Sequence, residues 1–184
     1  MIKIKIPDHF YNEKKYALHV LIEQILNVNV SYSYGDESDV VIDLENGMKL
    51  ILEDSFFSKF DEEEGYLHEK NMPDQVLFMK NRFTEENDLP VFFGNPEIET
   101  DNLSINIKGD ILATVFFLLS RWEEHILTYR DEHDRFPGKK SFLQKNKLHY
   151  RPIVNETAYF LRNALKSLKY NIEISSADFQ IKPT

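Results

Sequence analysis

Apolar and polar residues alternate at the start of the chain. Ile2, Ile4 and Ile6 are separated by two lysines, and Pro7 follows them. A period of two is typical of a strand with one buried face, and proline ends such a strand. Residues 16–26 then carry apolar side chains at helical spacing. The pattern therefore predicts a strand followed by a helix.

Residues 28–52 continue in the pattern of a sheet. Two of their short apolar runs are separated by Asn46 and Gly47. Both of these residues tolerate positive φ, so the dipeptide predicts a hairpin turn. Between residues 53 and 102 the apolar islands are short and lie among Pro, Gly, Asn and acidic residues. We expect a meander of short strands and loops there.

The second half of the chain predicts two further helices joined by a long loop. Gly109 and Asp110 supply a turn and an N-cap for a helix over residues 111–126, whose first half is apolar all round and must be buried. A polar connection over 128–147 leads to an amphipathic helix over 153–168.

Spaced apolar residues between 172 and 181 predict closing strands at the end of the chain. Together these patterns indicate an α+β or α/β fold: a mixed β-sheet with two principal helices and a long loop between them. The principal helices are residues 16–26 and 111–126, and we expect the second to be the more buried.

Composition narrows the class of protein. With 184 residues and 42% hydrophobic content, residues 1–184 fit a single globular domain. The absence of Cys excludes disulfides, thiolate nucleophiles and Cys-based metal sites. A net charge of −9 with dispersed basic residues argues against nucleic acid as a partner. The acidic run at 61–64 is expected in a solvated loop.

The apolar segments also bear on location. The strongest run, residues 111–119, is too short for a membrane span, which needs about 20 residues. The N-terminus has no continuous apolar stretch of the kind found in signal peptides. We therefore expect no membrane span and a cytoplasmic location.

The densest group of chemically capable side chains lies between residues 121 and 135. Its members are Arg121, Glu123, Glu124, Asp131, His133 and Arg135. Arg121 and Glu124 are spaced to pair on a helix, whereas Glu123 points to a different side. The simplest interpretation is a structural one, in which Arg121 and Arg135 tie the 128–147 loop to the body through Glu124 and Asp131.

A functional interpretation of the same residues is a small stand-alone metal-dependent hydrolase using the acids and histidines of residues 123–134. His133 could then act as a general acid or base. No nucleophile motif surrounds Ser120 or Ser141, and no metal-ligand spacing or phosphate-binding Gly-rich loop is present. We therefore assign no catalytic residue, metal or cofactor to this segment.

A third interpretation is a carbohydrate-binding module that uses exposed aromatic residues. Trp122, Tyr129 and Tyr150 are the candidates. Trp122 continues a helix that we expect to be buried, so its side chain is expected to lie in the core.

Three segments carry a family resemblance: FFLLSRWEE at 116–124, DEHDRFP at 131–137 and RPIVN at 151–155. They resemble a bacterial domain family of unknown function that is found N-terminal to polysaccharide-deacetylase-like catalytic domains. The resemblance covers residues 110–165 and the early helix. The family usually has Gly where this chain has Asp134, and Asp can adopt left-handed geometry at modest cost.

This resemblance implies a non-catalytic accessory domain that packs on or positions a catalytic domain in the same polypeptide. The downstream domain is the expected partner, and carbohydrate is the alternative one. The strand-like end at residues 179–184 is then expected to be a cut at a domain border. On this interpretation the parent protein is a deacetylase-like hydrolase, and this segment alone has no such activity.

Overall fold

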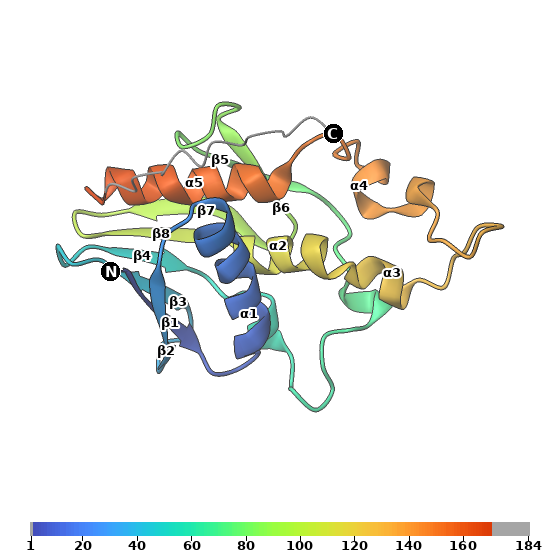
Figure 1. The fold of residues 1–184 in the computed structure, drawn as a ribbon, viewed down its shortest axis with the longest axis horizontal. Coiled ribbons are helices and arrows are strands. Elements are labelled where there is room, and N and C mark those ends of the chain that lie inside the picture. The colour runs from blue at the N-terminus through green and yellow to red at the C-terminus, as the bar shows by residue number, and fades with distance from the viewer. Residues whose placement is uncertain (1, 171–184) are drawn as a thin grey trace, which may run out of the picture.

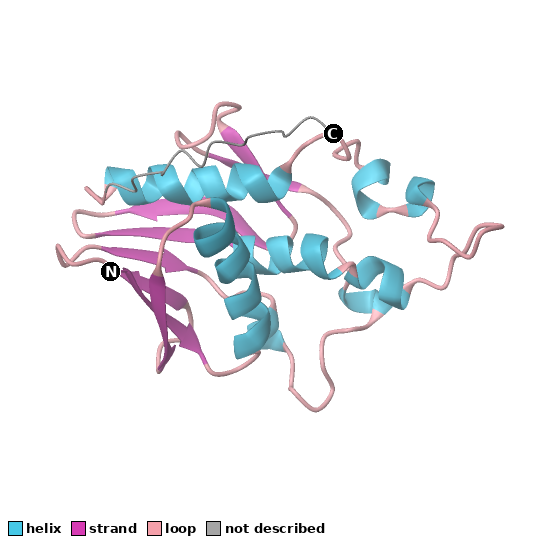
Figure 2. Ribbon diagram, in the orientation of Figure 1, coloured by secondary structure: helices cyan, strands magenta, loops and turns pink. Residues whose placement is uncertain are grey.

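The strands form a six-stranded mixed sheet and a separate two-stranded ribbon in the computed structural model, which describes residues 2–170. The strands are β1 (Ile2–Pro7), β2 (Val30–Gly35), β3 (Val40–Asp43), β4 (Lys49–Leu52), β5 (Leu77–Lys80), β6 (Asp88–Val91), β7 (Gly94–Thr100) and β8 (Ser104–Gly109). Figure 2 shows them with the helices that complete a mixed α+β fold. The predicted fold class is confirmed.

The sheet order is β2-β1-β3-β4-β8-β7. β1 pairs in parallel with β2, and β4 with β8, while the other neighbours are antiparallel. The β3–β4 turn contains Gly47 with φ 80°, which confirms the predicted hairpin. The ribbon of β5 and β6 is antiparallel and falls in the predicted meander. Among the described residues, β2 and β7 are the two edge strands of this sheet.

Five α-helices accompany the strands among residues 2–170. They are α1 (Tyr11–Leu18), α2 (Ile111–Ser120), α3 (Trp122–Ile126), α4 (Phe142–Lys145) and α5 (Ile153–Ser167). A π-helical segment, η1 (His19–Ile25), continues α1, and η2 (Phe57–Lys59), η3 (Glu69–Asn71) and η4 (Gly138–Lys140) are 3₁₀ turns. In Figure 1 α1, α2 and α5 cover one face of the sheet.

The early helix begins at Tyr11 with a polar first turn, close to the start near Asn12 and Glu13 that the sequence indicates ahead of the apolar residues 16–26. The helix predicted over 111–126 is wrong in its length. Asp110 caps α2 as expected, with its side chain accepting from the Ala113 N–H, but Arg121 adopts φ 53° and separates α2 from α3. Left-handed geometry is unfavourable for Arg, and nothing in the residue type signals the break.

The connection predicted over 128–147 is irregular for most of its length but contains η4 and α4. Ser141 caps α4 by accepting from the Gln144 N–H. Asp134 adopts φ 57°, the left-handed geometry expected of it. α5 follows as predicted. The closing strands predicted between 172 and 181 lie outside the described residues.

Two hydrophobic cores divide the fold. We call the sheet with α1, η1 and α5 the body; its core is aliphatic and includes Ile4, Leu21, Ile42 and Leu161. We call residues 53–76, which follow β4, together with α3 and α4, the lobe. Its core is mainly aromatic: Phe10, Phe56, Phe57, Tyr66, Phe92, Phe117, Trp122 and Phe142. α2 contributes to both cores, and its first half is buried as predicted.

Buried polar groups join the lobe to the body. Lys14 Nζ on α1 lies 2.6 Å from Asp54 Oδ2, with both side chains almost fully buried. Asp110 accepts hydrogen bonds from the Ser55, Phe56 and Ala113 N–H groups. Burial raises the pKa of Asp110 to about 7, although these backbone donors act in the opposite direction. The start of the lobe is therefore held by two carboxylates.

The sheet face opposite the helices is polar. Lys5 lies 3.2 Å from Asp43, and Lys108 lies 3.5 Å from both Glu53 and Glu99. These side chains alternate with the buried residues of their strands, as one-sided burial of a sheet requires. Within residues 2–170, the helices are each too short or too polar to cross a membrane.

Candidate functional site

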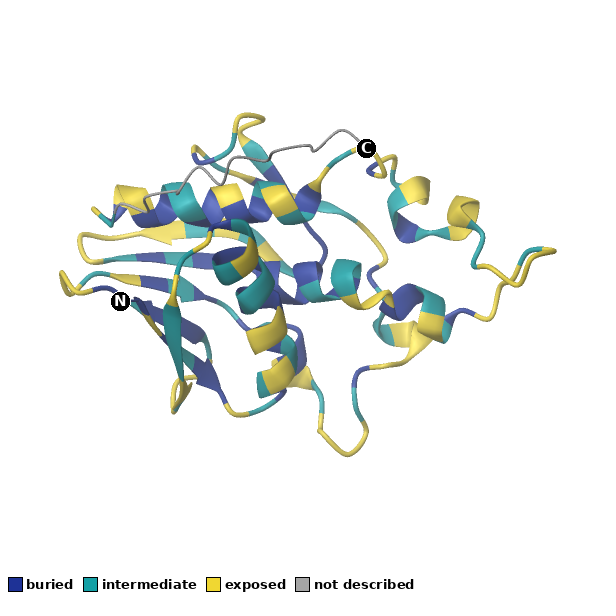
Figure 3. Ribbon diagram, viewed as in Figure 1, coloured by how far each residue is buried: buried dark blue, intermediate teal, exposed yellow. Residues whose placement is uncertain are grey.

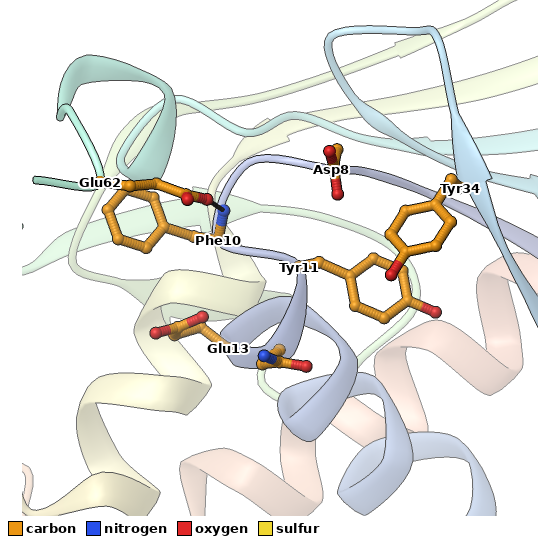
Figure 4. Close-up of a pocket in the computed structure, with 7 residues that line it drawn as sticks. Asp8, Phe10, Tyr11, Glu13, Tyr34 and Glu62 are labelled. Atoms are coloured by element: carbon orange, nitrogen blue, oxygen red, sulfur yellow. Dashed lines mark hydrogen bonds between the residues drawn. The ribbon is translucent and has the colours of Figure 1, made fainter.

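A pocket of about 400 Å³ opens where β1 ends and α1 begins (Figure 4). Its polar and aromatic lining consists of Asp8, Phe10, Tyr11, Asn12, Glu13, Tyr34 and Glu62. β1 and β2 are parallel, with Pro7 paired to Gly35, so their carboxyl ends meet at this edge of the sheet. Loops that follow parallel strands gather there and can place side chains from distant parts of the chain together.

Two tyrosines form one wall of the pocket. The ring centroids of Tyr11 and Tyr34 are 4.6 Å apart, with the planes inclined at 37°. Tyr34 is 68% exposed, so much of its ring faces solvent. Burial raises the pKa of Tyr11, and the neighbouring Tyr34 hydroxyl adds to the rise. Tyr11 is therefore a neutral phenol at neutral pH and can both donate and accept a hydrogen bond.

The opposite wall is acidic and borders the lobe. Phe10 has φ 47°, and its backbone N–H donates to Glu62 Oε1 at 3.0 Å. The Phe10 ring packs against Phe57 and Tyr66 in the lobe core. The Glu62 carboxylate thus fixes the turn that leads into α1. Sequence analysis placed this glutamate in a solvated acidic loop, and no spacing rule connects it with a residue 52 positions earlier.

Several polar groups of the pocket are left for a ligand. Among residues 2–170, the Asp8 carboxylate, the Asn12 amide and the Tyr11 and Tyr34 hydroxyls make no hydrogen bond to other side chains or backbone. Lys15 Nζ lies 5.5 Å from the Tyr11 ring centroid, outside the pocket lining. The arrangement can accept hydrogen bonds from hydroxyl or ammonium groups and can stack on an apolar ring face.

The cluster predicted between 121 and 135 does not converge on one site. Arg121 pairs with Glu124, and Arg135 lies 3.0 Å from Asp131, so both expected pairs form. Each pair joins residues three or four positions apart, and both arginine side chains are about 70% exposed. The expectation that these pairs tie the loop to the body is therefore wrong. They order the surface segment to which both partners belong.

Glu123 makes the long-range contact instead. Its Oε1 accepts from the Phe142 N–H at 2.6 Å, across 19 positions of the chain. The residue is buried, and this burial raises the pKa of its carboxyl. The side chain does point to a different side from Glu124, as predicted. The sequence pattern did not predict that the Glu123 side chain contacts Phe142 at the start of α4.

His133 is exposed at the loop tip, with Nε2 3.4 Å from Glu132 Oε1. Asp131 Oδ1 accepts from the backbone N–H groups of His133 and Arg135, which closes the tip into a tight turn. In Figure 3 the tip lies beyond α3 and α4 and is largely exposed. A search of residues 2–170 finds no group of three or more His, Asp or Glu side chains placed to hold a metal ion.

The proposed aromatic residues separate into two kinds. Trp122 is 1% exposed and stacks with Phe93 at 6.0 Å between ring centroids, so it belongs to the lobe core as expected. Tyr129 and Tyr150 are exposed. Sequence analysis did not select Tyr11 or Tyr34, because the strand and helix that carry them are adjacent only in the folded chain.

Arg151 makes a further long-range contact, and the sequence pattern did not predict a role for it. Its guanidinium lies 2.6 Å from Glu156 and 3.0 Å from Asp88, and it connects the start of α5 with β6. These two carboxylates raise the pKa of Arg151. Arg151 of the RPIVN segment therefore has a structural role.

Comparison with known proteins identifies one family. Residues 2–170 match a family described as "Family of unknown function (DUF7033)". Searches of curated proteins and of solved structures gave no match. The match extends well beyond the segments at 110–165 that carried the resemblance.

Proposed function

The chain belongs to this family of unknown function, and we propose that it is a non-catalytic accessory domain that binds carbohydrate in the pocket beside Tyr11 and Tyr34. In this proposal the domain serves a polysaccharide-deacetylase-like catalytic domain of the same polypeptide and positions that domain on its substrate. The resemblance of residues 116–155 supports the deacetylase part of the proposal, and the pocket supports the carbohydrate part.

The observation that carries the proposal is the composition of the pocket. Tyrosine rings pack on the apolar faces of sugar rings, and Tyr34 offers an exposed ring fixed against Tyr11. A carboxylate accepts hydrogen bonds from hydroxyl groups and an amide both accepts and donates them, and the side chains of Asp8 and Asn12 make no hydrogen bond within the described chain. A pocket with an aromatic wall and convergent polar groups is the usual form of a small-ligand site.

The charge of the pocket refines the ligand class. Asp8, Glu13 and Glu62 are all carboxylates, and no lysine or arginine among residues 2–170 lines the pocket. A ligand with ammonium groups is therefore favoured over a neutral one, and an anionic ligand is disfavoured. A sugar polymer that has lost acetyl groups carries such amines.

The test is a calorimetric titration of the domain with a short oligomer of N-acetylglucosamine and with its deacetylated form. We expect the deacetylated form to bind more tightly, because its amines face three carboxylates. Tyr34→Ala should weaken binding about tenfold, equivalent to about 1.4 kcal/mol. Tyr150→Ala is the matched control, because that tyrosine is also exposed but lies outside the pocket.

Two results would contradict the proposal. If Tyr150→Ala weakens binding as much as Tyr34→Ala, or if neither oligomer binds, the pocket is not a sugar site. Release of acetate from the acetylated oligomer by the domain itself with a divalent metal, abolished by His133→Ala, would instead support the stand-alone hydrolase.

A further inference from the structure

The two edges of the six-stranded sheet are protected to different degrees. On β7, Pro96 lacks a backbone N–H, Glu97 and Glu99 add charge, and the pairing register shifts between Gly94 and Ile98. Proline, charge and irregular pairing are the features that prevent an edge strand from pairing with another chain. β7 is therefore a blocked edge.

β2 has none of these features. Its sequence, VSYSYG, contains no charge and no proline, and all six residues pair with β1 in unbroken register. In the described chain, the outer side of β2 has no neighbouring strand, and its backbone makes no hydrogen bond to a loop. A regular, uncharged edge leaves a row of N–H and C=O groups free to pair.

We propose that β2 pairs with β2 of a second copy of this chain, antiparallel and about a two-fold axis at Tyr32, so that one continuous sheet runs through a homodimer. An antiparallel pairing of two identical strands is self-complementary, as a closed dimer requires. In this register Tyr34 lies opposite the partner's Val30, and Ser33 lies opposite the partner's Ser31.

The side-chain pairs across the two strands favour a second copy of this chain as the partner of β2. An aromatic residue opposite a β-branched one, and a hydroxyl opposite a hydroxyl, are stabilising pairs in antiparallel sheets. Tyr34 and Val30 share the helix face of the sheet, and Tyr34, 68% exposed in the single chain, can contact the partner's Val30 with one part of its ring while another part still lines the pocket. Ser31 and Ser33 share the opposite face, beside Lys3 and Lys5 of β1.

The charges next to β2 also avoid one another in this arrangement. Asp36 and Glu37 follow the strand, and the register places them opposite the partner's Val28 and Asn27 rather than opposite acids. Like charges directly opposite would oppose pairing. A chain with net charge −9 can therefore associate at this edge without stacking its acidic residues.

Sedimentation equilibrium of the full chain tests the interface. We expect a concentration-dependent dimer, and Ser33→Lys should shift it to monomer, because the new ammonium group faces the partner's Ser31, which lies beside the partner's Lys3. Thr100→Lys on β7 is the matched control and should leave the dimer intact. Circular dichroism of both variants checks that the fold is kept. A wild-type monomer at every concentration, or a dimer indifferent to Ser33→Lys, would overturn the proposal.

The absence of Cys permits a test of the register. Variants S31C and S33C are oxidised separately and as a mixture. The register predicts faster disulfide-linked dimer formation in the mixture, because position 31 faces position 33 across the axis. Equal rates in all three samples would exclude pairing about Tyr32.

Discussion

The body and the lobe of this fold are stabilised in different ways. In the body, aliphatic side chains recur at every second strand residue or every third to fourth helix residue, and they pack into one continuous core. In the lobe, aromatic rings come from short turns and loops, such as Phe56, Phe57 and Tyr66. Trp122 is packed by these rings, and its indole N–H has no partner within the described chain.

The difference teaches that regular structure spreads stability over many equivalent contacts, whereas irregular structure depends on a few specific ones. The backbone of the body is paired by its own sheet and helices. The backbone of the lobe is held at particular points by the carboxylates of Asp54, Asp110 and Glu123. A buried backbone N–H that loses its acceptor costs about 1–3 kcal/mol, so each of these carboxylates stabilises the lobe at one defined point.

Lys14→Met should have the largest effect. It removes one partner of a pair in which Asp54 is also buried, and such a change costs about 3–5 kcal/mol because the remaining charge is stranded. Hydrogen exchange should show protection lost first in the segment after β4. Lys108→Met, which removes the partly exposed ion pairs with Glu53 and Glu99 on the sheet surface, is the control and should change urea unfolding much less. Equal effects of the two variants would refute the distinction between body and lobe.

The pH dependence of stability should come next in size. Burial raises the pKa of Asp110 from 3.8 to about 7, so the folded state binds a proton that the unfolded state has released. The free energy of unfolding should therefore fall as pH rises from about 4 to about 7, by at most about 1.4 kcal/mol per pH unit from this group. Urea unfolding at several pH values measures the slope.

The variant Asp110→Asn distinguishes the contribution of Asp110 to the pH dependence from that of the other titratable groups. Asn has one oxygen and one NH2 group in place of the two carboxylate oxygens, so it loses either the hydrogen bonds from the Ser55 and Phe56 N–H groups or the one from the Ala113 N–H. The variant should therefore be less stable at every pH but should show a flatter profile. A profile of unchanged slope would show that Asp110 does not titrate in this range.

Glu123→Ala should have a moderate effect confined to the lobe. Loss of the acceptor for the buried Phe142 N–H costs about 1–3 kcal/mol. We expect faster proteolysis between α3 and α4, with the body unaffected. Glu124→Ala is the neighbouring control, since Glu124 pairs only with exposed Arg121 among the described side chains. Equal cleavage of both variants would show that the hydrogen bond from the Phe142 N–H to Glu123 does not hold α4 in place.

Arg135→Ala should have the smallest effect. Its ion pair with Asp131 is exposed and lies within a single turn, so the midpoint of thermal unfolding should not change measurably. The backbone bonds that Asp131 accepts remain in the variant. A clear drop in the midpoint would show that the loop tip contacts more of the molecule than its own turn.

The sequence predicts the body much better than the lobe. Alternation identified β1, and Asn46 with Gly47 identified the hairpin, because these signals are local. The break at Arg121 was not predictable, since the apolar pattern continues through it and the geometry is imposed by packing of Trp122. The pocket was also missed, because Glu62 and Tyr34 meet Tyr11 only through the crossing of strands and loops.

The hydrogen bond from the Phe142 N–H to Glu123 brings the two ends of an 18-residue excursion together at its base. For a loop whose ends are already fixed, doubling the length adds only about 0.6 kcal/mol of closure entropy. Residues 128–140, none of which is buried, can therefore vary in number and kind without disturbing the aromatic core, whereas Ile126 and Leu127 pack into the protein interior. This makes the excursion a natural insertion point, where a fluorescent tag or an epitope could be added while the fold is preserved.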